Sequence, residues 1–351
     1  MKRILSICCT AIISLSSFGF ASCFMLPDKG NSTKNIILFI GDGMGENHLT
    51  NTLTYFDLQY PNFFQGRHGS LETHSADNLV TDSAAGATAF ATGVKVNNGE
   101  IAQHVGENLQ TIWEIALSLG KKVGVVTTDV LTGATPAAFS SHAANRNNLI
   151  TILQGQTVSG VHLLMGEESS IYNGSEELFA ENGYKFAKST EEMFNFANEE
   201  KLIATLPEIR SSYSEGNETD FQLIDMVKFA MDFLENENGY FLMVESAYID
   251  KFSHLNQLIP ALCEVRSLFD CADYLYNEIG NDTALIVTAD HESGRLQLAK
   301  NKEEMANTLY KSSGHSGANV PLFLKNCTFE YTTTPQNTYI FELCKDLFDL
   351  E

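Results

Sequence analysis

Basic residues are scarce in this 351-residue chain, which has 22 lysines and arginines against 44 aspartates and glutamates. Broad nucleic-acid binding needs a cationic surface that displaces counterions, so the charge balance argues against it. Disorder is also excluded, because hydrophobic residues make up 44% of the chain and aromatic residues 10%. The length allows one large domain or two modest ones, and we expect a single domain over residues 30–351.

Cysteine is rare as well: there are seven, and Cys8 and Cys9 lie in the N-terminal apolar segment. The paired spacing that is typical of a zinc ribbon is missing. Cys263 and Cys271 are eight positions apart on an expected helix, roughly 12 Å along its axis, so a disulfide between them would break the helix. We therefore expect buried free thiols after Cys23.

Long apolar runs are missing except for one near the N-terminus. Lys2 and Arg3 precede Ile4–Ala21, which has no charged residue. This pattern is typical of an export signal over residues 1–22, although a retained membrane anchor has the same features. The stretch Phe-Ala-Ser-Cys at 20–23 resembles a bacterial lipoprotein box, in which Cys23 is lipidated; plain cleavage is the alternative. Lipidation and plain cleavage both predict a location outside the cytoplasm, in the periplasm or attached to the outer membrane of a bacterium.

Short apolar segments bounded by polar residues or glycine recur along the chain. They are Ile36–Ile40, Val123–Thr127, Val161–Met165, Tyr240–Val244 and Ala284–Thr288. Helical patterns lie between several of them. One helix face is marked by Phe221, Ile224, Val227, Met231 and Leu234, and another by Leu258, Leu262, Val265, Phe269, Ala272 and Ile279.

This alternation predicts an α/β fold, a three-layer sandwich whose mainly parallel central sheet is flanked by helices on both faces. The region Gly166–Thr219 is rich in Glu, Asn and Ser. There we expect irregular surface structure and short helices, and no separate domain. In such folds ligands bind beyond the carboxyl ends of the strands.

Carboxylates and imidazoles follow the expected strands. They are Asp42, Glu245, Asp250, His254, Asp290 and His291, with His315 before the apolar Val320–Leu324. Each has a simpler explanation: a turn aspartate, a surface pair on a helix, a helix cap or a loop histidine. Together at one sheet edge, they predict a metal centre in which oxygen and imidazole ligands suit zinc and an all-oxygen position suits magnesium. Bound cations would also allow this acidic chain to act on anions.

Ser83 lies in Thr81–Ala89, where cap-forming residues are followed by small helix formers. This order places Ser83 at a helix N-terminus, where free backbone amides and the helix dipole favour an anion. A plain N-cap serine is the alternative. No Gly-x-Ser-x-Gly elbow surrounds Ser83, so activation by a metal is favoured over a hydrolase triad.

Arg146 follows the segment Thr135–Ala138. The planar guanidinium of arginine can hold two oxygens of a phosphoryl group, although a surface helix residue is the alternative. We expect His142 on the same helix as Arg146 and interpret it as a structural histidine.

Six motifs in order, from about Asn35 to Leu324, give the chain a resemblance to the alkaline phosphatase family. They are Gly-Asp-Gly-Met-Gly (41–45), Thr-Asp-Ser-Ala-Ala-Gly-Ala-Thr-Ala (81–89), Ala-Thr-Pro-Ala-Ala (134–138), Val-Glu-Ser-Ala-Tyr-Ile-Asp-Lys (244–251), Thr-Ala-Asp-His-Glu (288–292) and Gly-His-Ser-Gly (314–317). The resemblance implies hydrolysis of small phosphate monoesters at alkaline pH through a phosphoserine at Ser83, with release of inorganic phosphate.

The resemblance also implies a ligand set. One zinc would be held by Asp250, His254 and His315. A second zinc would be held by Asp42, Asp290 and His291. One magnesium would be held by Asp42, Thr135 and Glu245. Arg146 would clamp the phosphate, and Lys251 would contact it through water. The alternatives are a phosphodiesterase, sulfatase or phosphate mutase of the same superfamily, or a non-catalytic surface lipoprotein that binds metal or phosphate.

The chain departs from the family pattern at two places. At Gly133 the family often has Asp or His near the magnesium. With no carboxylate there to neutralise Lys251, we expect tight phosphate binding and slow product release. The segment between His291 and His315 is short, so a large crown-like insertion is missing, and a homodimer through such a crown is in doubt.

Overall fold

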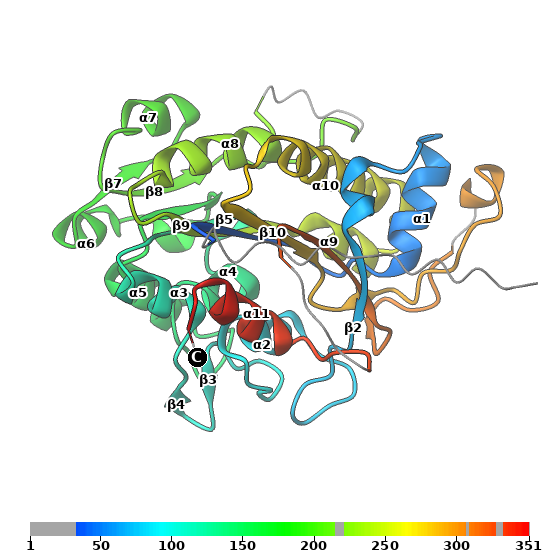
Figure 1. Cartoon of the computed structure of the whole chain (residues 1–351), viewed down its shortest axis with the longest axis horizontal. Coiled ribbons are helices and arrows are strands. Elements are labelled where there is room, and N and C mark those ends of the chain that lie inside the picture. The colour runs from blue at the N-terminus through cyan, green and yellow to red at the C-terminus, as the bar shows by residue number, and fades with distance from the viewer. Residues whose placement is uncertain (1–32, 215–220, 307–308, 328–332, 351) are drawn as a thin grey trace, which may run out of the picture.

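A computed structural model describes residues 33–214, 221–306, 309–327 and 333–350 of the chain. Its main feature is a sheet of nine strands (Figure 1). In spatial order these are β2 (Arg67–Leu71), β13 (Val320–Lys325), β10 (Thr283–Thr288), β1 (Asn35–Gly41), β9 (Tyr240–Ser246), β5 (Lys122–Val130), β6 (Leu163–Glu167), β8 (Lys201–Leu206) and β7 (Tyr184–Ala187). The strands from β10 to β7 run parallel. At one edge, β13 pairs antiparallel with β10, and β2 pairs antiparallel with β13.

Helices cover both faces of this sheet (Figure 1). One face has α8 (Leu223–Leu234) and α10 (Leu258–Glu278). The other has α3 (Ile112–Ser118), α4 (Ala134–Ala138) and α5 (Leu149–Val158), with α2 (Ser83–Thr92) and α11 (Tyr339–Leu347) beneath them. The remaining α-helices of the described residues are α1 (Glu46–Tyr55), α6 (Glu176–Glu181), α7 (Thr190–Asn195) and α9 (Tyr248–His254). The predicted three-layer sandwich with a mainly parallel sheet is confirmed.

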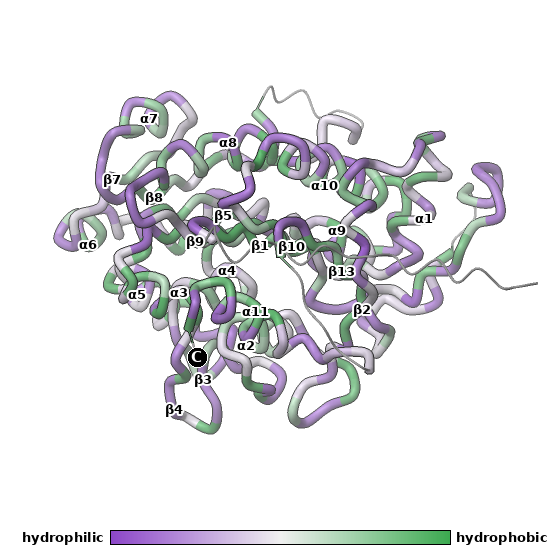
Figure 2. The backbone as a smooth tube through the Cα atoms, in the orientation of Figure 1, coloured by the Kyte–Doolittle hydropathy of each residue, from purple (hydrophilic) through white to green (hydrophobic). Residues whose placement is uncertain are grey.

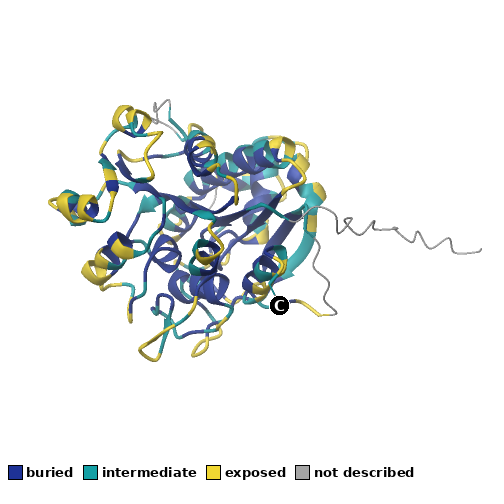
Figure 3. Ribbon diagram, turned by 60° about the vertical axis from the view of Figure 1, so that its left-hand side comes forward, coloured by how far each residue is buried: buried dark blue, intermediate teal, exposed yellow. Residues whose placement is uncertain are grey.

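The central strands contain continuous apolar stretches because both of their faces are covered, and polar residues follow these stretches at the carboxyl ends of β5 and β9. In β1 every residue from Ile36 to Ile40 is fully buried. Figure 2 shows these strands as the hydrophobic centre of the molecule, and Figure 3 shows the buried sheet between helices whose outer faces are exposed.

The two helix faces predicted from periodicity differ in outcome. All six residues of the α10 stripe are buried, as expected. In α8, Ile224 and Met231 are only half-buried, and the face against the sheet instead contains Leu223, Met226 and Phe233. Apolar residues occupy more than one stripe of α8, so periodicity alone does not identify the arc that faces the sheet.

The prediction of irregular structure for Gly166–Thr219 is wrong in part. Short helices occur there, but β8 and β7 extend the central sheet, with β8 parallel to β6 and β7 parallel to β8. Strand β7 has four residues, of which Lys185 is exposed, so its sequence has little of the apolar character of the inner strands. A short edge strand of this kind is a known way to limit unwanted pairing.

The short segment after His291 packs on the first turns of α10. Leu296, Met305 and Tyr310 form a small second hydrophobic cluster with Leu258 and Leu262. This cluster fixes the loop that leads from His291 to His315, with residues 307 and 308 outside the described part of the chain.

The four cysteines of the described residues are free thiols, as expected; three of them are buried, whereas Cys327 is only half-buried. None of the described helices combines the length and the apolar content needed to cross a bilayer. The expected signal at residues 1–22 and the lipidation site Cys23 lie outside the described residues.

Candidate metal centre

The strand register aligns the carboxyl ends of the central strands. Ile40 of β1 pairs with Glu245 of β9 and with Thr288 of β10, and Glu245 pairs with Thr127 of β5. The residues that follow these pairs therefore emerge at the same sheet edge. This is the physical reason that Asp42 and Asp290, nearly 250 positions apart in the chain, lie in one site.

Three groups converge on the Nε2 atom of His291. The Ser83 hydroxyl oxygen lies 3.1 Å from it, Asp290 Oδ2 3.3 Å and Asp42 Oδ1 3.4 Å. His291 is fully buried, and its other ring nitrogen is 3.4 Å from the Ser293 hydroxyl. The Asp290–His291 pair therefore does not cap a helix, which was the simpler explanation of its sequence; it enters the short strand β11 (Glu292–Ser293).

A second group consists of Asp250, His254 and His315. Helix α9 presents Asp250 and His254 one turn apart, with His254 Nε2 3.0 Å from Asp250 Oδ2. His315 comes from the short strand β12 (His315–Ser316), and its Nε2 is 3.6 Å from Asp250 Oδ1. The rings of His291 and His315 stack with centroids 3.5 Å apart, so the two groups are neighbours.

Two buried carboxylates in this site are strongly disfavoured as anions. Burial, followed by repulsion from Asp290, Asp250 and Glu245, raises the pKa of Asp42 well above its usual range. Burial raises the pKa of Asp290 to about 7, with further repulsion from Asp250. Asp42 Oδ1 and Asp290 Oδ2 are buried and have no hydrogen-bond partner within the described part of the chain. Buried anionic oxygens without partners are costly, and a divalent cation would compensate them. The residues present thus fit metal ions.

Ligand sets for two ions are recognisable by geometry. The ligand atoms of Asp250, His254 and His315 all lie within 4.8 Å of one another, and so do those of Asp42, Asp250 and His291. The first set is the expected one. The second set contains Asp250 in place of the expected Asp290. Asp290 is nevertheless close, because its Oδ2 lies 3.3 Å from His291 Nε2.

Glu245 and Thr135 form the expected all-oxygen corner. Glu245 is buried, and burial together with the nearby Asp129 carboxylate raises its pKa to about 8. The Thr127 hydroxyl donates a hydrogen bond to Glu245 Oε2. The Thr135 hydroxyl lies near enough to favour the charged form of Glu245, but it is buried and makes no regular hydrogen bond. A small hard cation would use this oxygen.

Ser83 is the first residue of α2, as expected, and is 4% exposed. The residue before it, Asp82, caps the helix by accepting a hydrogen bond from the Ala85 amide. The Ser83 hydroxyl therefore lies where the free amides and the helix dipole stabilise negative charge. This part of the site follows from local sequence alone.

Arg146 approaches the site in an unexpected way. We predicted a helix that contains Arg146 and His142, but both residues lie in the loop between α4 and α5. Arg146 Nη1 is 3.2 Å from Asp82 Oδ2. Its positive charge partly offsets the rise that burial causes in the pKa of Asp42, and it adds to the lowering that burial causes in the pKa of His291. Asp82, which sequence reasoning missed, therefore links the helix cap to the guanidinium.

His142 has structural contacts. Its Nδ1 lies 2.8 Å from the carbonyl of Ala102 and its Nε2 lies 3.2 Å from Glu114 Oε1. Because a carbonyl only accepts, Nδ1 is the protonated nitrogen in this contact. The geometry agrees with the interpretation of His142 as a structural residue.

Lys251 is not an unpaired cation, and the premise of our expectation about Gly133 is wrong. The Lys251 ammonium forms an ion pair with Asp129 Oδ1. Asp129 belongs to β5, four positions before Gly133. A neutralising carboxylate is therefore present, but it comes from a position that the family pattern does not mark.

Ser293 joins the two ligand groups and was also missed. Its hydroxyl donates a hydrogen bond to Asp250 Oδ1 and lies beside His291 Nδ1. A single serine thus orients one ligand from each group. Orientation of this kind by a second layer of residues is usual around protein-bound metals.

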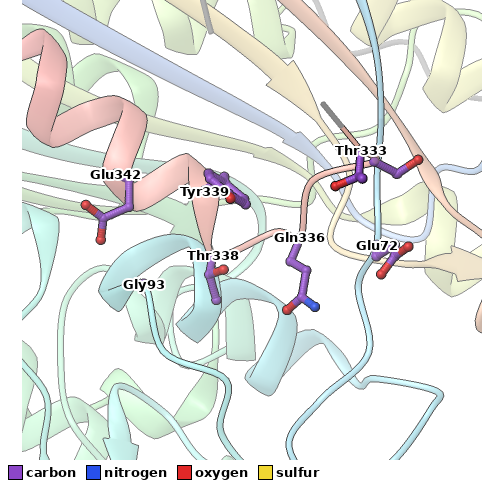
Figure 4. Close-up of a pocket in the computed structure, with 8 residues that line it drawn as sticks. Glu72, Gly93, Thr333, Gln336, Thr338, Tyr339 and Glu342 are labelled. Carbon is purple, nitrogen blue, oxygen red and sulfur yellow. The ribbon is translucent and has the colours of Figure 1, made fainter. Parts of the chain in front are cut away.

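A surface pocket of about 810 Å³ lies at the other end of α2 (Figure 4). Gly93, which follows the last residue of α2, lines it, roughly 15 Å along the helix axis from Ser83. Glu72 and Glu342 also line it. Two carboxylates beside the negative end of a helix dipole disfavour a phosphate ester, so this pocket does not compete with the site at Ser83.

The fold and the site together define an α/β protein with a buried metal-binding centre beside a serine at a helix N-terminus. The sequence profile of the family "Alkaline phosphatase" matches residues 33–162 and 173–338. The chain belongs to the alkaline phosphatase family.

Individual relatives support the same assignment. "Alkaline phosphatase 4" of Bacillus subtilis (strain 168) is 29% identical over 77% of this chain and 64% of its own length. "Repressible alkaline phosphatase" of Saccharomyces cerevisiae is 32% identical over 84% of this chain and 61% of its own length. The chain thus spans less than two thirds of these relatives. The solved structure of alkaline phosphatase from the Antarctic bacterium TAB5 is similar with a TM-score of 0.80 and 26% identity, over 92% of this chain and 99% of that one.

Proposed function

We propose that this protein hydrolyses phosphate monoesters and releases inorganic phosphate, with Ser83 as the nucleophile. The observation that supports the proposal most directly is the position of the Ser83 hydroxyl, 3.1 Å from His291 Nε2 and next to unpartnered buried carboxylate oxygens. Asp82, and not Ser83, caps α2, so a capping role does not explain the position of Ser83.

Two zinc ions and one magnesium ion are the proposed cofactors. Asp250, His254 and His315 would hold one zinc; Asp42, Asp290 and His291 would hold the other; Asp42, Thr135 and Glu245 would hold magnesium. Bound at these residues, the ions would lower the pKa of the serine hydroxyl and of water and would offset phosphate charge. A solved structure of a TAB5 alkaline phosphatase mutant has Mg bound in its M3 site.

The protein's own residues would act in two steps. Ser83 Oγ would form a bond to phosphorus as the ester P–O bond breaks and the alcohol leaves. Water would then cleave the phosphoserine, restoring the hydroxyl and releasing phosphate. The N-terminus of α2 would stabilise the serine oxygen as negative charge develops on it. Because the serine and water must both lose a proton, the rate should rise toward alkaline pH; an acid optimum would contradict the mechanism.

Arg146 would hold two non-bridging phosphate oxygens through its planar guanidinium. Arg146 forms an ion pair with Asp82, which caps α2, the helix that begins at Ser83. This ion pair supports the role because it fixes the guanidinium relative to Ser83. Lys251 is the second proposed phosphate contact.

The test is a comparison of one monoester and one diester with the same leaving group, alongside metal content by elemental analysis. We expect monoester hydrolysis that is lost on chelation, restored by Zn²⁺ and Mg²⁺, and reduced on the order of 10³-fold or more by Ser83→Ala. Faster diester hydrolysis would identify another member of the superfamily. Metal or phosphate binding without hydrolysis would identify a binding protein.

Export with removal of residues 1–22, and lipid attachment at Cys23, are proposals from the N-terminal sequence. They predict that the protein fractionates with the bacterial envelope and that Cys23→Ser releases it from membranes. Sedimentation of the purified protein would test whether it forms a homodimer.

A further inference from the structure

The ion pair between Lys251 and Asp129 is held in place from several sides. Lys251 is half-buried, next to Asp250 on α9, and its ammonium also lies 4.2 Å from the centre of the Tyr248 ring. The guanidinium of Arg210 lies 3.0 Å from the same ring, and the Tyr248 hydroxyl donates to Glu167. The lysine is thus confined beside the site and is not a freely moving surface cation.

Asp129 is fixed by its own backbone and its neighbours. Its Oδ1 accepts a 2.7 Å hydrogen bond from the Val130 amide, and its own amide lies 2.8 Å from the Thr127 hydroxyl. Thr127 in turn donates to the candidate ligand Glu245. Asp129 is therefore connected to Lys251 through its carboxylate and to the all-oxygen corner of the site through its backbone amide.

The other oxygen of Asp129 lies over Gly133. A Cβ atom placed on Gly133 would be 2.7 Å from Asp129 Oδ2 and 3.0 Å from the carbonyl of Val130. The φ angle of Gly133 is −56°, which any residue can adopt, so lack of space and not backbone conformation favours glycine here. Asp129 occupies the position that a side chain at 133 would need.

We propose that Asp129 is a positioning residue that neutralises Lys251 and so weakens the binding of the product, inorganic phosphate. This inference rests on the proposed phosphatase function. A lone ammonium beside the site would attract the phosphate dianion through its full charge. An ammonium paired with a carboxylate produces a much weaker electric field at the phosphate, so the product leaves more readily.

Asp129→Asn is the discriminating variant because it keeps the size of the side chain and removes its charge. We expect the inhibition constant for inorganic phosphate to fall about five- to tenfold, with a smaller change at high salt. A second readout avoids turnover: equilibrium dialysis of labelled phosphate against metal-loaded Ser83→Ala, with and without Asp129→Asn, should show the same tightening.

The control experiment uses a variant of Lys251. Lys251→Met alone should weaken phosphate binding, and adding Asp129→Asn to Lys251→Met should change it less than twofold, because the effect of Asp129 acts through the ammonium. Thermal unfolding of each variant checks folding. Should Asp129→Asn misfold, Lys251→Met still tests the inference, because unchanged phosphate affinity in that variant overturns it.

Other outcomes are equally decisive. Unchanged or weaker phosphate binding in Asp129→Asn would overturn the role of Asp129 while the wild-type rate upholds the proposed function. An equal effect of Asp129→Asn with and without Lys251 would also overturn it. If the wild-type protein neither hydrolyses monoesters nor binds phosphate, the proposed function fails and this inference fails with it.

Discussion

The Nε2 atoms of His254 and His315 lie 3.1 Å apart, and the Nδ1 atom of each ring faces a backbone carbonyl. A carbonyl only accepts, so both Nδ1 atoms are protonated and both Nε2 atoms of the neutral rings present lone pairs to each other. That contact is repulsive unless a proton or a cation lies between them. With Asp250 beside the pair, the arrangement suits a zinc ion.

The first prediction follows from this pair. His315→Ala should raise the dissociation constant for Zn²⁺ by about 100-fold, because a directly bound ligand is lost. Competition with a chromogenic zinc chelator measures it. His104→Ala is the matched control, since His104 pairs with Glu100 away from this centre, and should leave zinc affinity unchanged. Equal zinc affinity in His315→Ala and the wild type would remove His315 from the ligand set.

The second prediction concerns the metal-free protein. Burial raises the pKa of Asp290 to about 7 and that of Glu245 to about 8, and the hydrogen bond with Asp250 raises the pKa of His254 to about 9. Between pH 6.5 and 8 the native state thus binds more protons than the unfolded state at all three groups. Linkage then requires the free energy of unfolding to fall as pH rises across this window, by about 1–3 kcal/mol.

Other groups set the limits of that window. The pKa values of His48 and His162 are lowered to about 4 by burial, so they act in the opposite direction below pH 6.5. Burial lowers the pKa of Lys95 to about 8, so it opposes the trend above pH 8. Denaturant unfolding in a chelator measures the slope. Zn²⁺ and Mg²⁺ should abolish it and Glu245→Gln should reduce it; a metal-free slope of zero or of opposite sign would contradict the prediction.

The sequence predicted most of the site because its residues lie in short segments at strand ends, where topology decides which residues meet. Asp42, Glu245 and Asp290 could be placed at one edge from a parallel sheet alone. Asp82 and Asp129 could not, because their roles depend on loop paths and rotamers. The path of the Arg146 loop and the edge strand β7 were missed for a related reason: local sequence patterns there are weak, and tertiary contacts decide the structure.

The third prediction separates Arg146 from the residue that orients it. Arg146→Ala should raise KM by about 10- to 100-fold through loss of two charge-assisted hydrogen bonds, and Arg146→Lys should recover only part, because an ammonium lacks the planar fork. Asp82→Asn keeps an oxygen that can cap α2 but lacks the charge, so it should raise KM several-fold with little change in melting temperature. Steady-state kinetics on a chromogenic monoester measures KM for each of these variants. A purely structural role for Asp82 would instead lower the melting temperature and leave KM unchanged.

The last prediction tests the crowding at Gly133. Gly133→Ala adds one methyl group that would lie 2.7 Å from Asp129 Oδ2, so we expect a loss of about 1–3 kcal/mol in the free energy of unfolding. In the Asp129→Ala background the carboxylate is gone and only the Val130 carbonyl, 3.0 Å away, remains close, so the same substitution should cost clearly less. Denaturant unfolding of the wild type, the two single variants and the double variant gives the coupling energy between positions 129 and 133. Gly174→Ala would be a poor control because the φ of Gly174 is positive. Gly280 has an ordinary φ, and a Cβ placed on it would meet only Asp282 Oδ1, at 3.0 Å; because Asp282 is exposed and can move aside, Gly280→Ala is the matched control. Additive effects of Gly133→Ala and Asp129→Ala would mean that the aspartate does not occupy the space above the glycine.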